Sequence, residues 1–223
     1  MLDLPAVAAV VALVAAAIGY ASTTAMMGNP AAMWLLFALY LVLGGVAVAR
    51  MWRDGTLLDL FRWRSGDIAL GAATALLLVA GAYVGRRALV PPGTSGDALV
   101  VRLYAQLGEV PRDRGAYALA TALVAATALL EELTWRGLVQ QILEERLGHR
   151  RGWLAASGLY ALAHAPTLVL LAMPGVGWNP LVLLAALGCG VVWGFWVGRL
   201  QRLAPSLVSH AIFTWVMVMQ LRL

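Results

Sequence analysis

The sequence predicts an all-α protein, a polytopic transmembrane helix bundle of about seven spans that form one integrated membrane domain. Of its 223 residues, 62% are hydrophobic and 12% are charged, against about 25% charged residues in soluble domains. The mean hydropathy is +0.82, and seven apolar runs approach the roughly 20 residues that a helical span requires. No polar linker is long enough to divide the chain. We therefore expect N-terminal transmembrane helices with a surface segment over residues 1–115, and a helical core over residues 116–223.

Turns and arginines separate the apolar runs and fix the expected spans. Pro30 lies in an uncharged turn after the first run, Arg50 ends the second, and Arg86 with Arg87 closes the third. Pro205 opens the last run. The expected spans cover residues 4–27, 31–49, 68–84, 117–147, 153–171, 181–197 and 205–221.

Two segments outside these spans and one glycine pattern complete the expected fold. Residues 57–64 have an amphipathic pattern and are expected to lie in the membrane interface. Residues 98–107 are expected to form a surface helix. Gly190, Gly194 and Gly198 recur every four residues in the sixth span, a stripe of small residues that suits close helix packing.

Charge indicates the origin and the topology of the chain. All sixteen basic residues are arginines, which indicates a GC-rich bacterium and hence the bacterial cytoplasmic membrane. The net charge of +5 is no argument for nucleic-acid binding, because the arginines flank the spans as topology signals and headgroup contacts. With the N-terminus inside, nine arginines lie on the cytoplasmic side and six on the other. The first run lacks a basic start and is long enough to span, so we expect no cleavable signal peptide. The single cysteine, Cys189, excludes an intramolecular disulfide.

Two adjacent carboxylates, Glu131 and Glu132, interrupt the fourth span. Each costs roughly 2.5–3.5 kcal/mol at membrane depth, so both need a polar cavity or partners. Arg136 lies one helical turn after Glu132 and can pair with it. The hydrophobic segments also hold two histidines, His164 and His210. The sequence therefore predicts a polar site enclosed by transmembrane helices.

A carboxylate and two histidines on separate helices can activate water. The carboxylate accepts a proton, one histidine orients the water, and donors on another helix stabilise the oxyanion. Each residue taken alone has a simpler explanation. Either histidine can be a packing residue, and Glu132 with Arg136 can be a structural ion pair. Tyr160 and Thr214 alone suggest helix packing, and the tryptophans of the last two spans suggest packing or interfacial anchoring.

Three ordered motifs resemble those of the CPBP family, the CAAX-protease and bacteriocin-processing family that is also called ABI. The resemblance covers about half of the chain, from residue 117 to the C-terminus. Each motif lies on a hydrophobic segment, in the order and spacing of the family. The motifs are Glu131-Glu132-x-x-x-Arg136, Tyr160-x-x-x-His164 and Pro205-Ser206-Leu207-x-x-His210-x-x-x-Thr214.

The resemblance implies an intramembrane endopeptidase whose catalytic core is residues 116–223. In that case Glu131 is the general base and activates water together with His164, while His210 and Thr214 form the oxyanion site. The resemblance also gives Glu132 and Arg136 a role in supporting the first motif.

Two positions depart from the family pattern. Tyr160 stands where the second motif usually has Phe. Thr214 stands where the third motif usually ends in Asn, so it offers one hydroxyl donor on a shorter side chain.

We expect a metal-free glutamate mechanism with no cofactor. Two histidines and two carboxylates could bind zinc, but no HExxH pair is present. The expected partners are the lipid bilayer and a membrane-associated protein or peptide substrate. By analogy with the family, that substrate is a prenylated tail, a bacteriocin-like peptide or a sorting tail, and a myxosortase-like role suits a bacterial member. The alternatives are a non-catalytic immunity or scaffold protein of the same fold, and a small proton-coupled transporter.

Overall fold

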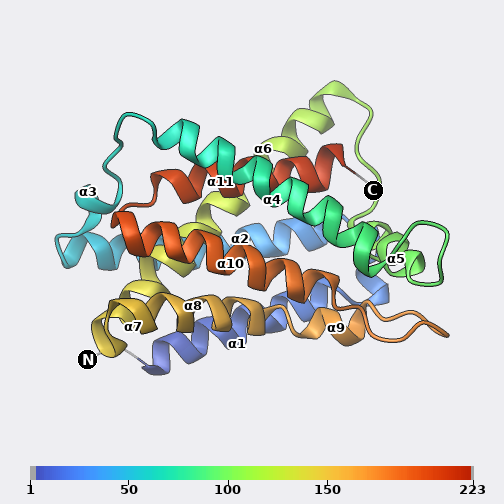
Figure 1. Cartoon of the computed structure of the whole chain (residues 1–223), viewed down its shortest axis with the longest axis horizontal. Helices are drawn as coiled ribbons and strands as arrows, with labels where there is room; N and C mark the ends of the chain where they lie inside the picture. The colour runs from blue at the N-terminus through green and yellow to red at the C-terminus, as the bar shows by residue number, and fades with distance from the viewer. Residues whose placement is uncertain (1–3, 222–223) are drawn as a thin grey trace.

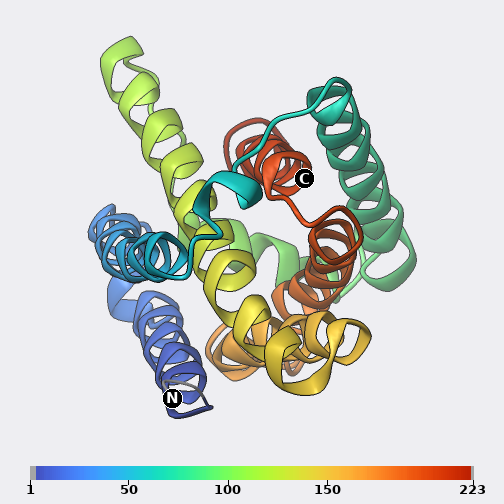
Figure 2. The same ribbon diagram turned by 90° about the vertical axis from the view of Figure 1, so that its left-hand side faces the viewer.

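The computed structural model of the chain describes residues 4–221, and its long helices lie lengthwise in one bundle (Figures 1 and 2). Within that range the structure has no strand, only an isolated β-bridge between Met173 and Gly177. The all-α class is therefore confirmed. The α-helices are α1 (Leu4–Ala21), α2 (Ala31–Arg53), α3 (Leu57–Leu60), α4 (Asp67–Leu89), α5 (Asp97–Leu107), α6 (Arg114–Glu132), α7 (Gln140–Leu147), α8 (His149–Ala163), α9 (Pro166–Leu170), α10 (Leu181–Leu200) and α11 (Ala204–Trp215).

Six helices within residues 4–221 are long and apolar enough to cross a membrane, and the protein is a multi-pass membrane protein. They correspond to the first six expected spans. The seventh expected span consists of the 12 residues of α11 and the 5 residues of a π-helical segment, Val216–Gln220. Together they make 17 residues, which is the lower end of the range of about 17–25 residues for a bilayer crossing.

The first expected span ends six residues early because α1 stops at Ala21. A 3₁₀ turn, Thr24–Met26, follows it and leads toward α2. The amphipathic segment is helical only over Leu57–Leu60, and the carbonyl of Leu60 accepts a hydrogen bond from the backbone N–H of Leu203 at 2.8 Å. This contact ties the segment to the start of α11.

The fifth expected span is broken at His164. The N–H groups of His164 and Ala165 bond to carbonyls three residues back, at Ala161 and Leu162, so the last turn is tightened. Pro166 has no N–H to continue the helical ladder, and it begins the short α9. The break places His164 at a helix end and not along a continuous face.

The acidic pair lies on the longest helical rod of the molecule. From α6 the chain continues through a π-helical segment, Leu133–Val139, into α7 without a break, as the sequence suggested. The rod has 34 residues, about 50 Å at 1.5 Å per residue, so it must tilt to match a hydrocarbon core of about 30 Å. Figure 2 shows α6 leaving the bundle at an angle to its neighbours. π-helical turns are rare and occur frequently at functional sites.

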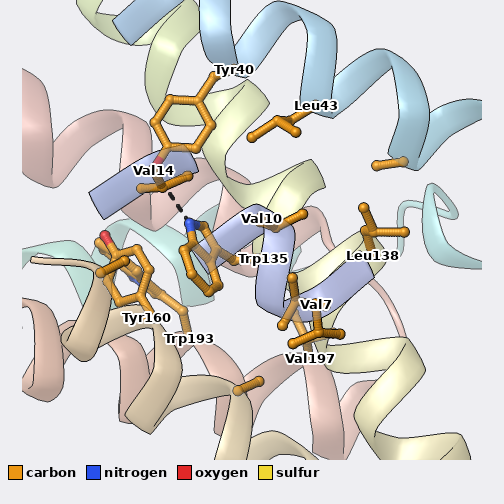
Figure 3. Packing of buried hydrophobic residues seen from close by; sticks show 14 of the residues in the cluster. Val7, Val10, Val14, Tyr40, Leu43, Trp135, Leu138, Tyr160, Trp193 and Val197 are labelled. Atoms are coloured by element: carbon orange, nitrogen blue, oxygen red, sulfur yellow. Dashed lines mark hydrogen bonds between the residues drawn. The ribbon is translucent and has the colours of Figure 1, made fainter. Parts of the chain in front are cut away.

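The core gathers side chains from both ends of the sequence. Val7, Val10 and Val14 on α1 lie beside Trp135 of the π-helical segment (Figure 3). Trp193 on α10 belongs to the same cluster and is 1% exposed. Helices of residues 1–115 therefore share one hydrophobic core with the helices that carry the motifs.

The glycine stripe brings α10 close to α8, as the spacing predicts. A methyl group added at Gly190 would lie 3.0 Å from the Tyr160 ring, and one at Gly194 would lie 2.7 Å from the Ser157 hydroxyl. Because the backbones are this close, Ser157 Oγ donates a hydrogen bond to the carbonyl of Gly190 at 2.8 Å. The stripe therefore sets the distance between two helices that flank the polar site.

Candidate active site

Glu132 is the most buried member of the acidic pair, with a side chain that is 0% exposed. Its Oε1 lies 3.1 Å from Arg136 Nη1 and accepts a hydrogen bond from His210 Nδ1 at 2.9 Å. The pairing of Glu132 with Arg136 that the spacing predicts is therefore present. A buried carboxylate is stable only with such partners. Glu132 thus joins the π-helical segment to α11.

Arg136 is kept away from lipid by a polar and aromatic pocket. Its side chain is 2% exposed, and Nη2 donates to the carbonyl of Gly190 at 3.3 Å. The guanidinium carbon lies 4.7 Å from the centroid of the Tyr160 ring and 5.5 Å from that of Trp193. The faces of both rings attract the guanidinium electrostatically, and this attraction is stronger because the site is shielded from water.

His210 lies in the middle of α11 and is 3% exposed. Its ring stacks on Trp193, with centroids 3.9 Å apart and planes 19° apart. Because Nδ1 is engaged by Glu132, the free edge of the ring is Nε2, which lies 3.9 Å from Glu131 Oε2. This separation is too long for a direct hydrogen bond. Glu131 Oε2 and His210 Nε2 are therefore both free to contact a small molecule or substrate group that lies beside them.

His164 has a defined tautomer. Its Nδ1 lies 2.8 Å from the carbonyl oxygen of Tyr160, which can only accept, so the proton of the neutral ring is on Nδ1. Nε2 then carries the lone pair. His164 lies within electrostatic range of Glu131 and His210. The end of α8 at Ala163 makes this position possible.

Glu131 is the open carboxylate of the pair. Its side chain is 13% exposed, against 0% for Glu132. The Tyr40 hydroxyl on α2 accepts a hydrogen bond from Trp135 Nε1 at 3.3 Å (Figure 3). Tyr40 also interacts with Glu131. Adjacent residues on one helix thus face different surroundings, and only Glu131 is accessible.

Thr214 lies one turn beyond His210, and its side chain lines an apolar cavity between α4, α5, α10 and α11. Of the predicted site residues, all of which the structure describes, Thr214 alone lines this cavity.

Two aromatic residues of the site have no place in the sequence motifs. Trp193 was interpreted as a packing residue, yet it forms one wall of the His210 site and donates from Nε1 to Ser209 Oγ at 3.0 Å. Tyr40 comes from α2, far from the motifs in sequence. In the sequence, the indication of a role for Tyr40 is its hydroxyl group in the middle of an apolar span.

The open carboxylate and the free histidine nitrogens suit proton transfer. Among residues 4–221 no three His, Cys, Asp or Glu side chains are placed to hold a metal ion together. Both histidine Nδ1 atoms are already bonded, one to a carbonyl and one to Glu132. What remains at the opening is one carboxylate and two Nε2 atoms.

The fold and the site define a class, namely multi-pass membrane proteins that enclose a Glu–His cluster between their helices. The model of a known family, the type II CAAX prenyl endopeptidase Rce1-like proteins, matches residues 113–216. Residues 113–216 are therefore similar to this Rce1-like family, which agrees with the CPBP resemblance that the motifs indicated. The family consists of CAAX-type intramembrane endopeptidases. Comparisons with curated proteins and with solved structures give no significant match.

Proposed function

We propose that the protein hydrolyses a peptide bond in the tail of a membrane-associated protein or peptide, with water activated by Glu131 and His164. The observation that carries the proposal is the distance of 3.9 Å between Glu131 Oε2 and His210 Nε2. It brings a proton acceptor and a potential oxyanion donor to opposite sides of one small space. The match of residues 113–216 to an endopeptidase family supports the same reaction.

The proposed reaction begins with a water molecule beside Glu131. The water donates one hydrogen bond to His164 Nε2, and its oxygen attacks the carbonyl carbon of the scissile bond while Glu131 takes the other proton. The carbonyl oxygen becomes an oxyanion. His210 Nε2 lies on the side of Glu131 and donates a hydrogen bond to the oxyanion when it carries a proton. Thr214, one turn further along α11, would supply a second donor.

The second half of the reaction returns the enzyme to its starting state. The tetrahedral intermediate collapses, the C–N bond breaks, and Glu131 passes its proton to the leaving nitrogen. The products are a new carboxylate and a new amine, and no cofactor is consumed. Glu132 and Arg136 hold His210 in place and take no part in proton transfer.

We further propose that the enzyme works in the bacterial cytoplasmic membrane on a sorting tail or a bacteriocin-like peptide. The arginine-only basic composition supports the bacterial origin. Bacteria mostly lack prenylated CAAX substrates, so peptide or tail processing, including a myxosortase-like role, is the better match. A non-catalytic scaffold role is disfavoured because Glu131, His164 and His210 are all retained and lie together.

The test is mass spectrometry of candidate tails in cells that carry the wild type or Glu131→Gln. The amide keeps the shape of Glu131 but accepts no proton, so hydrolysis should fall at least about 10²-fold at normal expression. His164→Ala should cause a similar loss. Glu109→Gln, at an exposed residue after α5, is the matched control and should process tails normally. Full processing by Glu131→Gln would rule out the proposed base.

A further inference from the structure

An apolar groove runs along α4 on the side toward α10. Its larger part is a half-open cavity of about 590 Å³ between α4, α5, α10 and α11. A second hollow of about 480 Å³ continues toward α8 and shares Leu77, Leu78 and Val192 with the first. Of the polar cluster described above, only Thr214 lines this groove.

Three glycines show that the groove is not closed by helix packing. Gly81 and Gly85 on α4 and Gly188 on α10 line the larger cavity, and a methyl group added at any of them would meet nothing within 4 Å. This contrasts with Gly190, where the same methyl group would lie 3.0 Å from Tyr160. Glycine is unfavourable inside a helix, and these three glycines gain no closer contact within the chain. They leave room for something from outside the chain.

The lining favours a hydrocarbon chain over a peptide. Apart from the sulfurs of Cys189 and Met217, the described lining side chains offer polar atoms only at Arg86, Tyr104 and Thr214. A peptide in this cavity would leave most of its N–H and C=O groups unsatisfied, whereas a hydrocarbon chain needs no partners. From Leu77 to Leu89, α4 rises about 18 Å, which is close to the ~15 Å half-thickness of the hydrocarbon core. The cavity therefore has the length of one acyl chain.

Arg86 gives the cavity a charged end. It lies in the last turn of α4, and its Nη2 donates to Asp97 Oδ1 at 2.8 Å. Its side chain is 18% exposed, and within residues 4–221 its buried Nε has no hydrogen-bond partner. The guanidinium thus has donors left for an acceptor at the cavity end, and phosphate is one of the acceptors that arginine binds most strongly.

The surroundings of Arg86 are basic overall. Residues 86–114 contain five arginines against three acidic residues. This segment is the exception to the arginine bias that orients the chain. Contact with anionic headgroups would explain why arginines gather here.

We propose that the groove binds one membrane lipid with an anionic phosphate headgroup. An acyl chain lies along Gly81, Gly85 and Gly188, and the phosphate accepts hydrogen bonds from Arg86. The bound lipid fills the opening between α4 and α10, which no side chain of the described residues closes.

Native mass spectrometry of the full chain in detergent tests the proposal. The delipidated protein is titrated with phosphatidylglycerol, with phosphatidylcholine of the same acyl chains, and with inorganic phosphate. We expect one phosphatidylglycerol to bind at least about tenfold more tightly than phosphatidylcholine, and inorganic phosphate alone not to bind. Arg86→Ala should remove this preference, and Gly81→Leu should weaken both lipids by filling the cavity.

Matched variants separate lipid binding from loss of fold. Arg87→Ala removes the neighbouring arginine, whose guanidinium lies 5.0 Å from the Tyr83 ring and does not line the cavity. Gly45→Leu adds the same bulk at an open position of α2. Asp97→Asn removes the ion pair between Asp97 and Arg86 but leaves the positive charge of Arg86 in place. All three should bind phosphatidylglycerol at least as well as the wild type.

Three results would overturn the proposal. Equal binding of both lipids, indifferent to Arg86→Ala, would show an unselective apolar groove. Binding of inorganic phosphate alone would show a free-anion site. Loss of binding in Asp97→Asn as well as in Arg86→Ala would show that the ion pair only holds α4 and α5 together.

Discussion

At the scale of single residues, the site separates two adjacent carboxylates by their surroundings. Glu132 has no exposed surface and two close partners, whereas Glu131 is open and lies 3.9 Å from the nearest histidine nitrogen. Different environments give chemically identical groups different roles, as in other two-carboxylate sites. In the proposed mechanism one carboxylate moves protons and the other holds the structure.

The structural role proposed for Glu132 predicts the effect of replacing Arg136. Arg136→Ala leaves the buried Glu132 carboxylate without its guanidinium partner, at a cost of about 3–5 kcal/mol. We expect a lower folded yield and lower activity, measured by size-exclusion chromatography in detergent and by tail processing. Arg151→Ala, at an exposed position of α8, is the control. Normal yield and activity of Arg136→Ala would show that the ion pair is dispensable.

The position of Thr214 gives a second prediction at this scale. In the proposed mechanism its hydroxyl is an oxyanion donor, so Thr214→Val should raise the barrier by about 1–3 kcal/mol at unchanged folded yield. Thr214→Asn restores the donor usual in the family and should keep or raise the rate of tail hydrolysis. Equal rates for Val and Thr at this position would assign the hydroxyl to the apolar cavity alone.

Sequence reasoning found the residues of the site better than their contacts. The pairing of Glu132 with Arg136 was predictable because it is local, one turn apart on one helix. The hydrogen bond from His210 to Glu132 joins residues 78 positions apart, and no pattern within one helix encodes it. The same reason hid Trp193 and Tyr40, whose roles depend on which helices become neighbours.

At the scale of elements, hydropathy located the helices but not their ends or interruptions. The break of α8 at His164 follows from Pro166, two residues beyond it, and could have been read from the sequence. The π-helical segment after Glu132 has no comparable signal, since no proline or glycine opens it, and it contains the buried Trp135 and Arg136. Both irregularities lie beside the polar cluster.

The glycine stripe gives the prediction for this scale. Gly194→Ala places a methyl group 2.7 Å from Ser157 Oγ, so overpacking between α8 and α10 should cost about 1–3 kcal/mol. Gly158→Ala adds the same methyl group where nothing lies within 4 Å, and should be neutral or stabilising by up to about 1 kcal/mol. Thermal unfolding in detergent should therefore shift in opposite directions. A stabilising Gly194→Ala would mean that α10 moves away from α8 at little cost.

At the scale of the whole molecule, the structure brings the connections after α2, α7 and α10 together at one end. Arg50 at the end of α2 bonds to Glu145 of α7 at 2.8 Å, and Arg202 bonds to Asp67 at the start of α4 at 2.7 Å. Figure 1 shows α3 and α7 at this end and α5 at the opposite end. Hydropathy alone does not predict which apolar helices become neighbours, because every span is equally at home in lipid. The polar contacts between loops therefore help to determine which helices become neighbours, which the sequence does not predict.

The arginines at the end of the molecule that holds α3 and α7 predict its orientation in the membrane. The arginine bias places this end, and with it Ser65, in the cytoplasm, and Ser95 beyond α4 on the other side. Cys189 is buried and is the single cysteine, so Cys189→Ala gives a background without thiols. In intact cells a membrane-impermeant maleimide should then label Ser95→Cys and not Ser65→Cys. After lysis both should react, since both serines are exposed. The reverse pattern in intact cells would invert the topology, and would place the five arginines of residues 86–114 in the cytoplasm.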